Sequence, residues 1–128
     1  MPNRPPVFKP AQSPSYEQQR GSAQARGYNS TWHRLAKRYR QAHPLCLGCL
    51  AVGWTTVAQC VDHVMPHRGD PALMWNQANL QAACRWHHDV VKQRLEHEWA
   101  QGRASIDDLK LDSSRAVALT KQLETTRF

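Results

Sequence analysis

The spacing of apolar residues predicts a helix that begins at Ser30 and ends before Pro44. The apolar members of this pattern are Trp32, Leu35, Ala36 and Tyr39, which recur at helical intervals. Ser30 is a suitable N-cap, and Pro44 ends the helix because proline cannot continue one. Basic residues occupy the other side, so we expect an amphipathic helix with one basic face.

Further along the chain, short β-rich segments are followed by two helical ones. Residues 52–57 are β-rich and interrupted by glycine, which is typical of a short hairpin, and residues 61–64 predict another strand. Val91, Leu95 and Trp99 recur every four residues and predict a helix that stops at Gly102. A second helical segment is predicted over residues 105–124, with Ser105 and Asp108 as a variant capping box. This mixture predicts an α+β fold.

The length of 128 residues favours one folded domain. Residues 1–27 hold five of the eight prolines and show no helical or strand period, which predicts a disordered, basic, proline-rich arm. Residues 28–102 form the predicted domain, and residues 103–128 a C-terminal helical extension. The sequence has no secretory signal and no run of roughly 20 apolar residues, so we expect a cytoplasmic protein with no membrane association.

The net charge of +7 is concentrated at the front of the chain. Up to Leu45 there are eight basic residues and one acidic residue, whereas nine of each follow from Cys46 onward. This asymmetry suits a polyanionic partner such as nucleic acid, although a solvated tail that only aids solubility is the alternative. Arg34, Lys37 and Arg38 on the predicted helix are the candidates for phosphate contacts.

Two pairs of metal-ligating residues predict a structural zinc site. Cys46 and Cys49 have CxxC spacing, and Cys84 and His87 have CxxH spacing. Two such pairs supply four ligands for a tetrahedral zinc ion, and disulfides are not expected in a reducing cytosol. His88 is an alternative to His87 as the fourth ligand. Cys60 is expected to be a core residue.

Together with these pairs, Asp62-His63, Asn79 and His88 form a pattern that resembles the HNH endonuclease family. The stretches Val61-Asp62-His63-Val64-Met65-Pro66-His67-Arg68-Gly69-Asp70 and Trp75-Asn76-Gln77-Ala78-Asn79-Leu80-Gln81 are especially similar to the HNH proteins of tailed bacteriophages and prophages. The resemblance covers about residues 27–100, and many relatives have cysteine where this chain has His87. It implies a small ββα-metal fold with zinc knuckles and flanking helices.

The resemblance also implies a role for each of these residues. His63 would be the general base, while Asp62 and His88 would hold one divalent cation, Mg²⁺ or Mn²⁺. Asn79 would orient His63 or complete the shell of the cation. Asp62 and His63 are adjacent in a predicted strand, where side chains alternate, so a shared site requires a bent strand.

Three more residues are assigned to contacts with DNA. His67 and Arg68 are expected to meet phosphates from the loop after the strand, because Pro66 opposes the helical HxxxH of zinc peptidases. Lys92 is expected to contact DNA, at a position where some relatives have a further metal-binding histidine.

The function that follows is a metal-dependent DNA endonuclease that makes nicks or double-strand breaks. By resemblance to phage proteins it would serve DNA packaging, with double-stranded DNA as substrate and the terminase and portal proteins as partners. The alternative is a zinc-stabilised DNA-binding module without catalysis.

Overall fold

The computed structural model describes the backbone of residues 22–127 and the side chains of residues 30–127. The chain divides into two compact units, residues 1–37 and residues 38–128. Most of the predicted disordered arm lies outside the described residues. The core and both candidate sites belong to the second unit.

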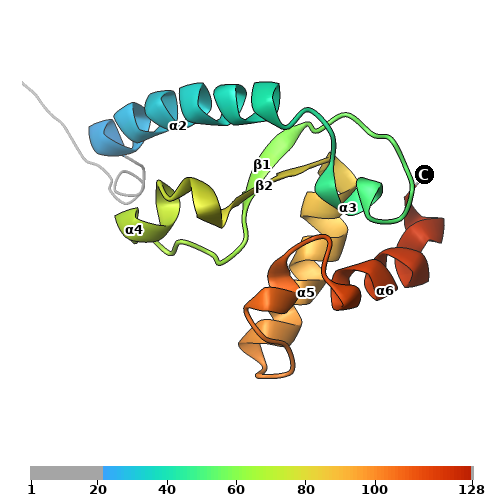
Figure 1. Ribbon diagram of the computed structural model, residues 1–128. Helices are drawn as coiled ribbons and strands as arrows, with labels where there is room; N and C mark the ends of the chain where they lie inside the picture. Colours follow the sequence, from blue (N-terminus) through green and yellow to red (C-terminus); the bar gives the residue numbers. More distant parts are fainter. Residues whose placement is uncertain (1–21, 128) are drawn as a thin grey trace, which may run out of the picture. The chain divides into compact units, whose positions relative to one another are not determined.

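The described part is a small α+β structure (Figure 1). In chain order the elements are α2 (Ser22–Ala42), α3 (Leu47–Leu50), β1 (Cys60–His63), α4 (Pro71–Met74), the 3₁₀ turn η1 (Gln77–Asn79), β2 (Leu80–Ala83), the π-helical turn η2 (His87–Val91), α5 (Lys92–Ala100), the 3₁₀ turn η3 (Asp107–Leu109), α6 (Ser114–Leu123) and the 3₁₀ turn η4 (Glu124–Thr126). Among the described helices, none combines the length and the apolar composition that a membrane span requires.

Helix α2 is longer at its start than the sequence predicts. It begins at Ser22, so Ser30 lies inside the helix and cannot be its N-cap. The residues between them include Ala23 and Ala25, which are strong helix formers, and no proline interrupts them. Residues 22–27, assigned to the arm, are therefore helical. The end at Ala42 agrees with the prediction, because Pro44 disfavours helical backbone in the residue before it.

Strands β1 and β2 form a two-stranded antiparallel ribbon, with Asp62 opposite Gln81 and His63 opposite Leu80. Strand β1 begins one residue earlier than predicted. The hairpin predicted over residues 52–57 is wrong, because the carbonyl of Cys49 accepts hydrogen bonds from the amides of both Val52 and Trp54 and turns the chain there. That region keeps one isolated bridge, between residues 45 and 57.

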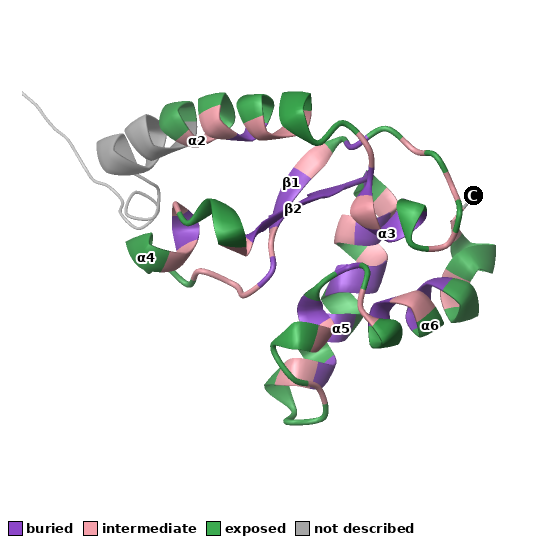
Figure 2. Ribbon diagram, in the orientation of Figure 1, coloured by how far each residue is buried: buried purple, intermediate pink, exposed green. Residues whose placement is uncertain are grey.

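The core draws equally on the middle of the chain and on its C-terminal part. Its buried members are Val64, Ala83, Val91, Leu95, Leu109, Leu111, Ala116 and Leu119. Buried positions follow β2 and the inner sides of α5 and α6 (Figure 2). Since half of these residues come after residue 103, the expected C-terminal extension is an integral part of the domain.

The helical segment predicted over residues 105–124 is interrupted. Ser105 and Asp108 exchange the hydrogen bonds of a capping box, but they start only the short turn η3. The cap of α6 is Ser113, whose hydroxyl accepts from the amide of Ala116. The N-cap of the long helix is therefore Ser113, eight residues after the predicted cap Ser105.

The helix after β2 contains an extra residue in its first part. The amide of Lys92 bonds to the carbonyl of His87 across the π-helical turn η2, and α5 continues from there. Such π turns place one additional residue in an α-helix and occur often at functional sites. Gly102, with a φ of +74°, ends the helical run as predicted.

Candidate functional site

Cys46, Cys49, Cys84 and His87 converge into one fully enclosed group. Their ligand atoms all lie within 4.8 Å of one another, and all four residues are buried. Cys46 is the N-cap residue of the short helix α3 and Cys49 lies within it, while Cys84 follows β2 and His87 begins η2. The group could hold a metal ion, and the structure selects His87 over His88 as its fourth member.

Four of the six distances among the ligand atoms are close to those of a tetrahedral zinc site. Nδ1 of His87 lies 3.5 Å from the Sγ atoms of Cys46, Cys49 and Cys84, and the last two sulfurs are 3.9 Å apart. A zinc ion with ordinary bond lengths separates sulfur from nitrogen by about 3.6 Å and sulfur from sulfur by about 3.8 Å. These residues therefore fit zinc.

A hydroxyl behind His87 fixes which ring nitrogen carries the proton. Oγ1 of Thr120 donates its hydrogen to the carbonyl of Ala116 and lies 3.0 Å from Nε2 of His87. Because that hydrogen is already committed, the hydroxyl accepts from Nε2, and Nδ1 presents its lone pair to the three thiols. Metal-binding histidines are commonly oriented in this way by an outer partner.

The thiols are electrostatically linked, and an arginine stands beside them. A hydrogen bond from Cys46 lowers the pKa of the Cys84 thiol and raises the pKa of Cys46. The guanidinium of Arg127 donates to Sγ of Cys49 and to Oγ1 of Thr56, and it lies over the ring of Trp54 at 4.1 Å. A positive group is thus placed beside Cys49 at the edge of the cluster.

The second group of polar residues lines an open cavity of about 370 Å³. Its lining residues are Val61, Asp62, His63, Pro66, His67, Arg68, His88, Gln93 and Glu96. The cavity therefore brings together the predicted base, both predicted cation ligands and the predicted loop contacts. Asp62 and His63 both reach it although they alternate in β1, because the chain bends into the loop directly after His63.

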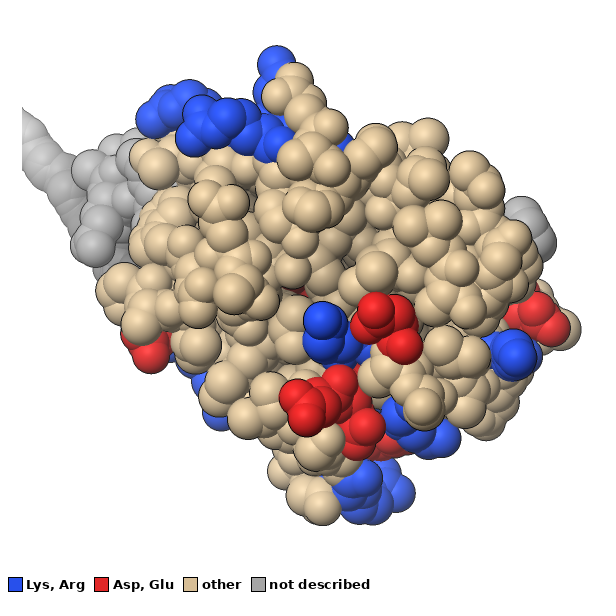
Figure 3. Space-filling view, viewed as in Figure 1, with Lys and Arg blue, Asp and Glu red and all other residues tan. Residues whose placement is uncertain are grey.

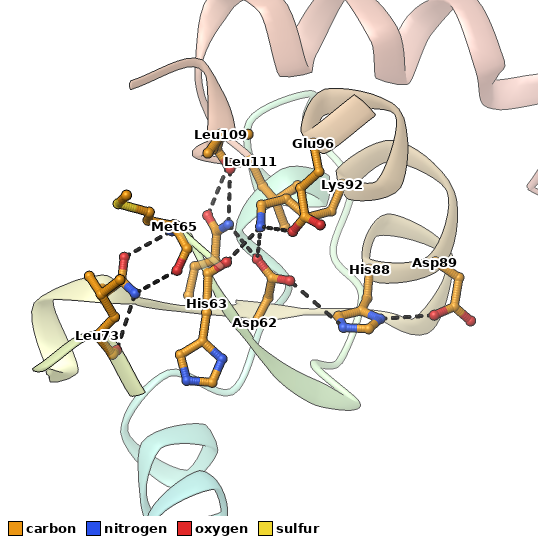
Figure 4. Close-up of polar contacts among 12 residues, drawn as sticks. Asp62, His63, Met65, Leu73, His88, Asp89, Lys92, Glu96, Leu109 and Leu111 are labelled. Carbon is orange, nitrogen blue, oxygen red and sulfur yellow. Dashed lines mark hydrogen bonds and ion pairs between the residues drawn. The ribbon is translucent and has the colours of Figure 1, made fainter. Parts of the chain in front are cut away.

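Asp62 and His88 present an oxygen and a nitrogen to each other. Oδ1 of Asp62 lies 3.7 Å from Nε2 of His88, somewhat wider than the about 3 Å between neighbouring ligands of an octahedral Mg²⁺. Nδ1 of His88 donates to Oδ1 of Asp89 at 2.8 Å, which leaves Nε2 as the basic nitrogen of the neutral ring (Figure 4). Burial raises the pKa of the Asp62 carboxyl, and the Lys92 ammonium opposes that rise. The pair places one carboxylate oxygen and one imidazole nitrogen side by side at the cavity.

His63 points away from the Asp62 carboxylate and is held from the other side (Figure 4). Its Nε2 lies 3.0 Å from the carbonyl of Met74, which can only accept, so Nε2 carries the proton and Nδ1 is the basic nitrogen. Partial burial lowers the pKa of His63 and favours the neutral ring. The ring of His67 packs edge-on against it at 4.8 Å.

Asn79 binds backbone groups of the loop that follows β1. Its Oδ1 accepts from the amide of Met65, and its Nδ2 donates to the carbonyls of Met65 and Leu73. These bonds close the loop between β1 and η1. Met74 lies in this loop, and its carbonyl accepts the hydrogen bond from His63. Asn79 thus shapes the backbone around His63 and has no recorded contact with the ring or with Asp62.

The assignment of Lys92 to DNA contact is wrong. Its side chain is completely buried, because the ammonium bonds to Oδ2 of Asp62, the carbonyl of His63 and Oε2 of Glu96. It cannot reach a phosphate without breaking these contacts.

The other candidates for DNA contact are accessible. Arg34, Lys37 and Arg38 are exposed on α2, where their spacing places them on one face, and basic side chains gather over this helix (Figure 3). Arg68 is exposed at the cavity, with a φ of +48° and its guanidinium 5.2 Å from the centre of the Trp99 ring. Strained backbone of this kind is often found at functional sites.

Several contributing residues were not identified from the sequence. Asp89 had a local signal, since a carboxylate next to a metal-binding histidine commonly orients it. Gln81, which donates to Asp62 at 2.8 Å, and Thr120 had no such signal, because each lies far along the chain from the residue that it supports.

Comparisons with protein families, with curated proteins and with solved structures gave no match.

Proposed function

We propose that this chain is a metal-dependent DNA endonuclease of the HNH type. The observation that carries the proposal is the single cavity in which His63, Asp62, His88 and Arg68 meet. It combines a basic imidazole, an oxygen and nitrogen pair suited to a divalent cation, and a cationic side chain for phosphate. These are the parts that hydrolysis of a phosphodiester needs.

We assign zinc to the group of Cys46, Cys49, Cys84 and His87, where it has a structural role. The four protein ligands leave no open position for a substrate, as in structural zinc sites generally. The site links α3 to the start of η2, and so it stabilises the segment that carries His88. One zinc per chain in elemental analysis supports this assignment, and a folded, zinc-free chain overturns it.

In the proposed reaction, Nδ1 of His63 takes a proton from a water molecule whose oxygen attacks the phosphorus. The bond between phosphorus and the 3′ oxygen breaks, and that oxygen leaves with a proton from solvent. Oδ1 of Asp62 and Nε2 of His88 would hold a divalent cation, which supplies charge stabilisation at the phosphate and the leaving oxygen. The guanidinium of Arg68 would donate a charge-assisted hydrogen bond to a non-bridging phosphate oxygen.

Double-stranded DNA is the proposed substrate because the basic residues gather on an exposed helix face. Arg34, Lys37 and Arg38 supply sequence-independent phosphate contacts. A role beside phage terminase and portal proteins is supported by the sequence resemblance alone.

The deciding experiment incubates supercoiled plasmid with the purified chain and Mg²⁺ or Mn²⁺. Wild type should produce nicked or linear DNA. His63→Ala should lower the rate by about 10²-fold or more while retaining divalent-cation binding, whereas His88→Ala should weaken cation binding itself. His97→Ala is the matched control, because His97 is exposed on α5 away from the cavity lining.

Each outcome has a distinct meaning. A His63→Ala rate above about one tenth of wild type would show that His63 is not the general base. Wild-type protein that binds DNA but never cuts it, with either cation, would favour the alternative of a non-catalytic zinc-stabilised module.

A further inference from the structure

Lys92 supplies the only ammonium or guanidinium that is completely buried among the residues whose side chains are described. Its Nζ lies 2.6 Å from the carbonyl oxygen of His63, 2.7 Å from Oε2 of Glu96 and 2.9 Å from Oδ2 of Asp62. An ammonium has three hydrogens to donate, so these partners use all of them. Lys92 thus touches both neighbouring residues of β1 that carry the proposed chemistry.

The contact divides the two oxygens of Asp62 between different tasks. Oδ2 accepts from Lys92 and also from Nε2 of Gln81, at 2.8 Å. Oδ1 is the oxygen that faces His88. Gln81 is itself fixed, because it donates to the carbonyl of Leu109 and accepts from the amide of Leu111. The carboxylate is therefore clamped on one side only, as Figure 4 shows for Asp62 between Lys92 and His88.

We propose that Lys92 is a positioning residue of the cation site, which holds Oδ2 of Asp62 so that the carboxylate offers a divalent cation a single oxygen, Oδ1. The inference rests on the proposed function, because it assumes that Asp62 and His88 bind a cation. It goes further in assigning the denticity of Asp62 and the size of cation that the site prefers.

The charges around Lys92 support a role toward a cation. One ammonium stands against two carboxylates, so Lys92 does not neutralise the cluster and one net negative charge remains. Glu96 lines the cavity and takes up part of the ammonium's charge, which keeps Asp62 attractive to a cation. A buried ion pair serving stability alone brings little net gain, because desolvation offsets the attraction.

Single-oxygen ligation favours small cations. Mg²⁺ and Mn²⁺ accept octahedral shells built from single oxygens and water, whereas Ca²⁺ takes six to eight oxygens and often binds carboxylates through both. A clamped Asp62 therefore disfavours Ca²⁺ relative to Mn²⁺. Releasing Oδ2 should remove this preference.

The test compares wild type with Lys92→Met/Glu96→Gln and with Glu96→Gln alone. The double variant removes one positive and one negative charge, so it keeps the net charge of wild type but takes the ammonium away from Oδ2 of Asp62, which keeps only its hydrogen bond from Gln81. The single variant keeps the contact between Lys92 and Asp62. Mn²⁺ affinity is measured by electron paramagnetic resonance and Ca²⁺ affinity by competition, with zinc content and thermal unfolding as checks on folding.

We expect the ratio of Ca²⁺ to Mn²⁺ affinity to rise about five-fold or more in the double variant. The ratio should stay within about two-fold of wild type in Glu96→Gln. A general loss of stability would not change the ratio between two cations. A folded double variant with the wild-type ratio would overturn the inference.

A second measurement needs no variant. In ¹⁵N-lysine-labelled wild type, the buried Lys92 ammonium should give a slowly exchanging signal that survives saturation with Mg²⁺. Loss of that signal on Mg²⁺ binding would mean that the cation displaces Lys92, which contradicts the proposal. Wild type that binds neither Mn²⁺ nor Mg²⁺ would overturn the proposed function as well as the inference about Lys92. If wild type binds these cations and cuts DNA, the proposed function stands, and a failure of the two measurements above overturns the inference alone.

Discussion

Gly48 lies so close to the ring of His87 that no side chain fits between them. A Cβ at this position would lie 2.3 Å from Cδ2 and 2.5 Å from Nε2 of His87, far inside van der Waals contact. We predict that Gly48→Ala displaces His87, lowers zinc content below one per chain and destabilises the domain by about 1–3 kcal/mol or more. Elemental analysis after dialysis, together with thermal unfolding, measures both effects.

Gly53→Ala is the control for Gly48→Ala. Gly53 has a φ of +84°, but an added Cβ would meet no atom within 4 Å. Its replacement should cost about 1–2 kcal/mol of backbone strain and leave zinc content unchanged. Equal zinc loss in the two variants would show that the close contact with His87 is not what matters.

At the scale of residues, the group of three cysteines and a histidine was predictable and the partners of Asp62 were not. Cys46, Cys49, Cys84 and His87 lie in local pairs whose spacing is itself the signal. Lys92 was misassigned because a lysine among charged neighbours is normally exposed. Only the fold reveals that Asp62 and Glu96 surround it.

At the scale of elements, one ion pair joins the end of α5 to α6. Arg115 donates to both carboxylate oxygens of Glu98, at 2.9 and 2.6 Å, and these hydrogen bonds hold the pKa of Glu98 below its usual range. A carboxyl whose pKa is lowered by folding stabilises the native state above its unfolded pKa, near 4.3. This stabilisation is lost as pH falls through the lowered folded pKa.

We predict that Arg115→Gln lowers stability at pH 7 by a few tenths to about 1 kcal/mol, because the pair is partly exposed and screened by solvent. The difference from wild type should shrink between about pH 4.5 and pH 2, as Glu98 becomes protonated in both proteins. Urea unfolding across this range provides the measurement. A difference that is the same at pH 7 and at pH 2 would show that Arg115 acts by packing alone.

Element types were easier to predict than element ends. The helix of Leu95 and Trp99 follows from apolar residues that recur every four positions. The strand of Asp62 was predicted from the short β-favouring segment of residues 61–64. Ser105 and Ser113 are both plausible caps, and the choice between them depends on Leu109 and Leu111, which enter the core and force the chain out of helical conformation between η3 and α6.

At the scale of the whole molecule, the uneven charge leads to a test of DNA binding. Reversing Arg34, Lys37 and Arg38 to glutamate should weaken binding to all sequences alike. It should also flatten the slope of log affinity against log salt by about 2–3 units, since each phosphate contact contributes about 0.9. Fluorescence anisotropy at several salt concentrations measures the slope.

The control makes the same change in charge elsewhere. Arg103, Lys110 and Lys121 are exposed and belong to the C-terminal part of the chain. Their reversal should alter the slope much less, because only long-range attraction changes. Equal effects of the two triple variants would show that net charge, rather than the face of α2, attracts DNA.

The π-helical turn affects which insertions and deletions this chain can accept during evolution. His87 faces the zinc group from this turn, and Lys92, the first residue after it, faces Asp62. A π turn absorbs one extra residue with little change in the direction of the residues beyond it, so deleting one residue from 89–91 would restore a regular α-helix and leave Lys92, Leu95 and Glu98 near their partners. Inserting a further residue would instead rotate everything beyond it by about 100°. This segment therefore tolerates the loss of one residue better than the gain of another.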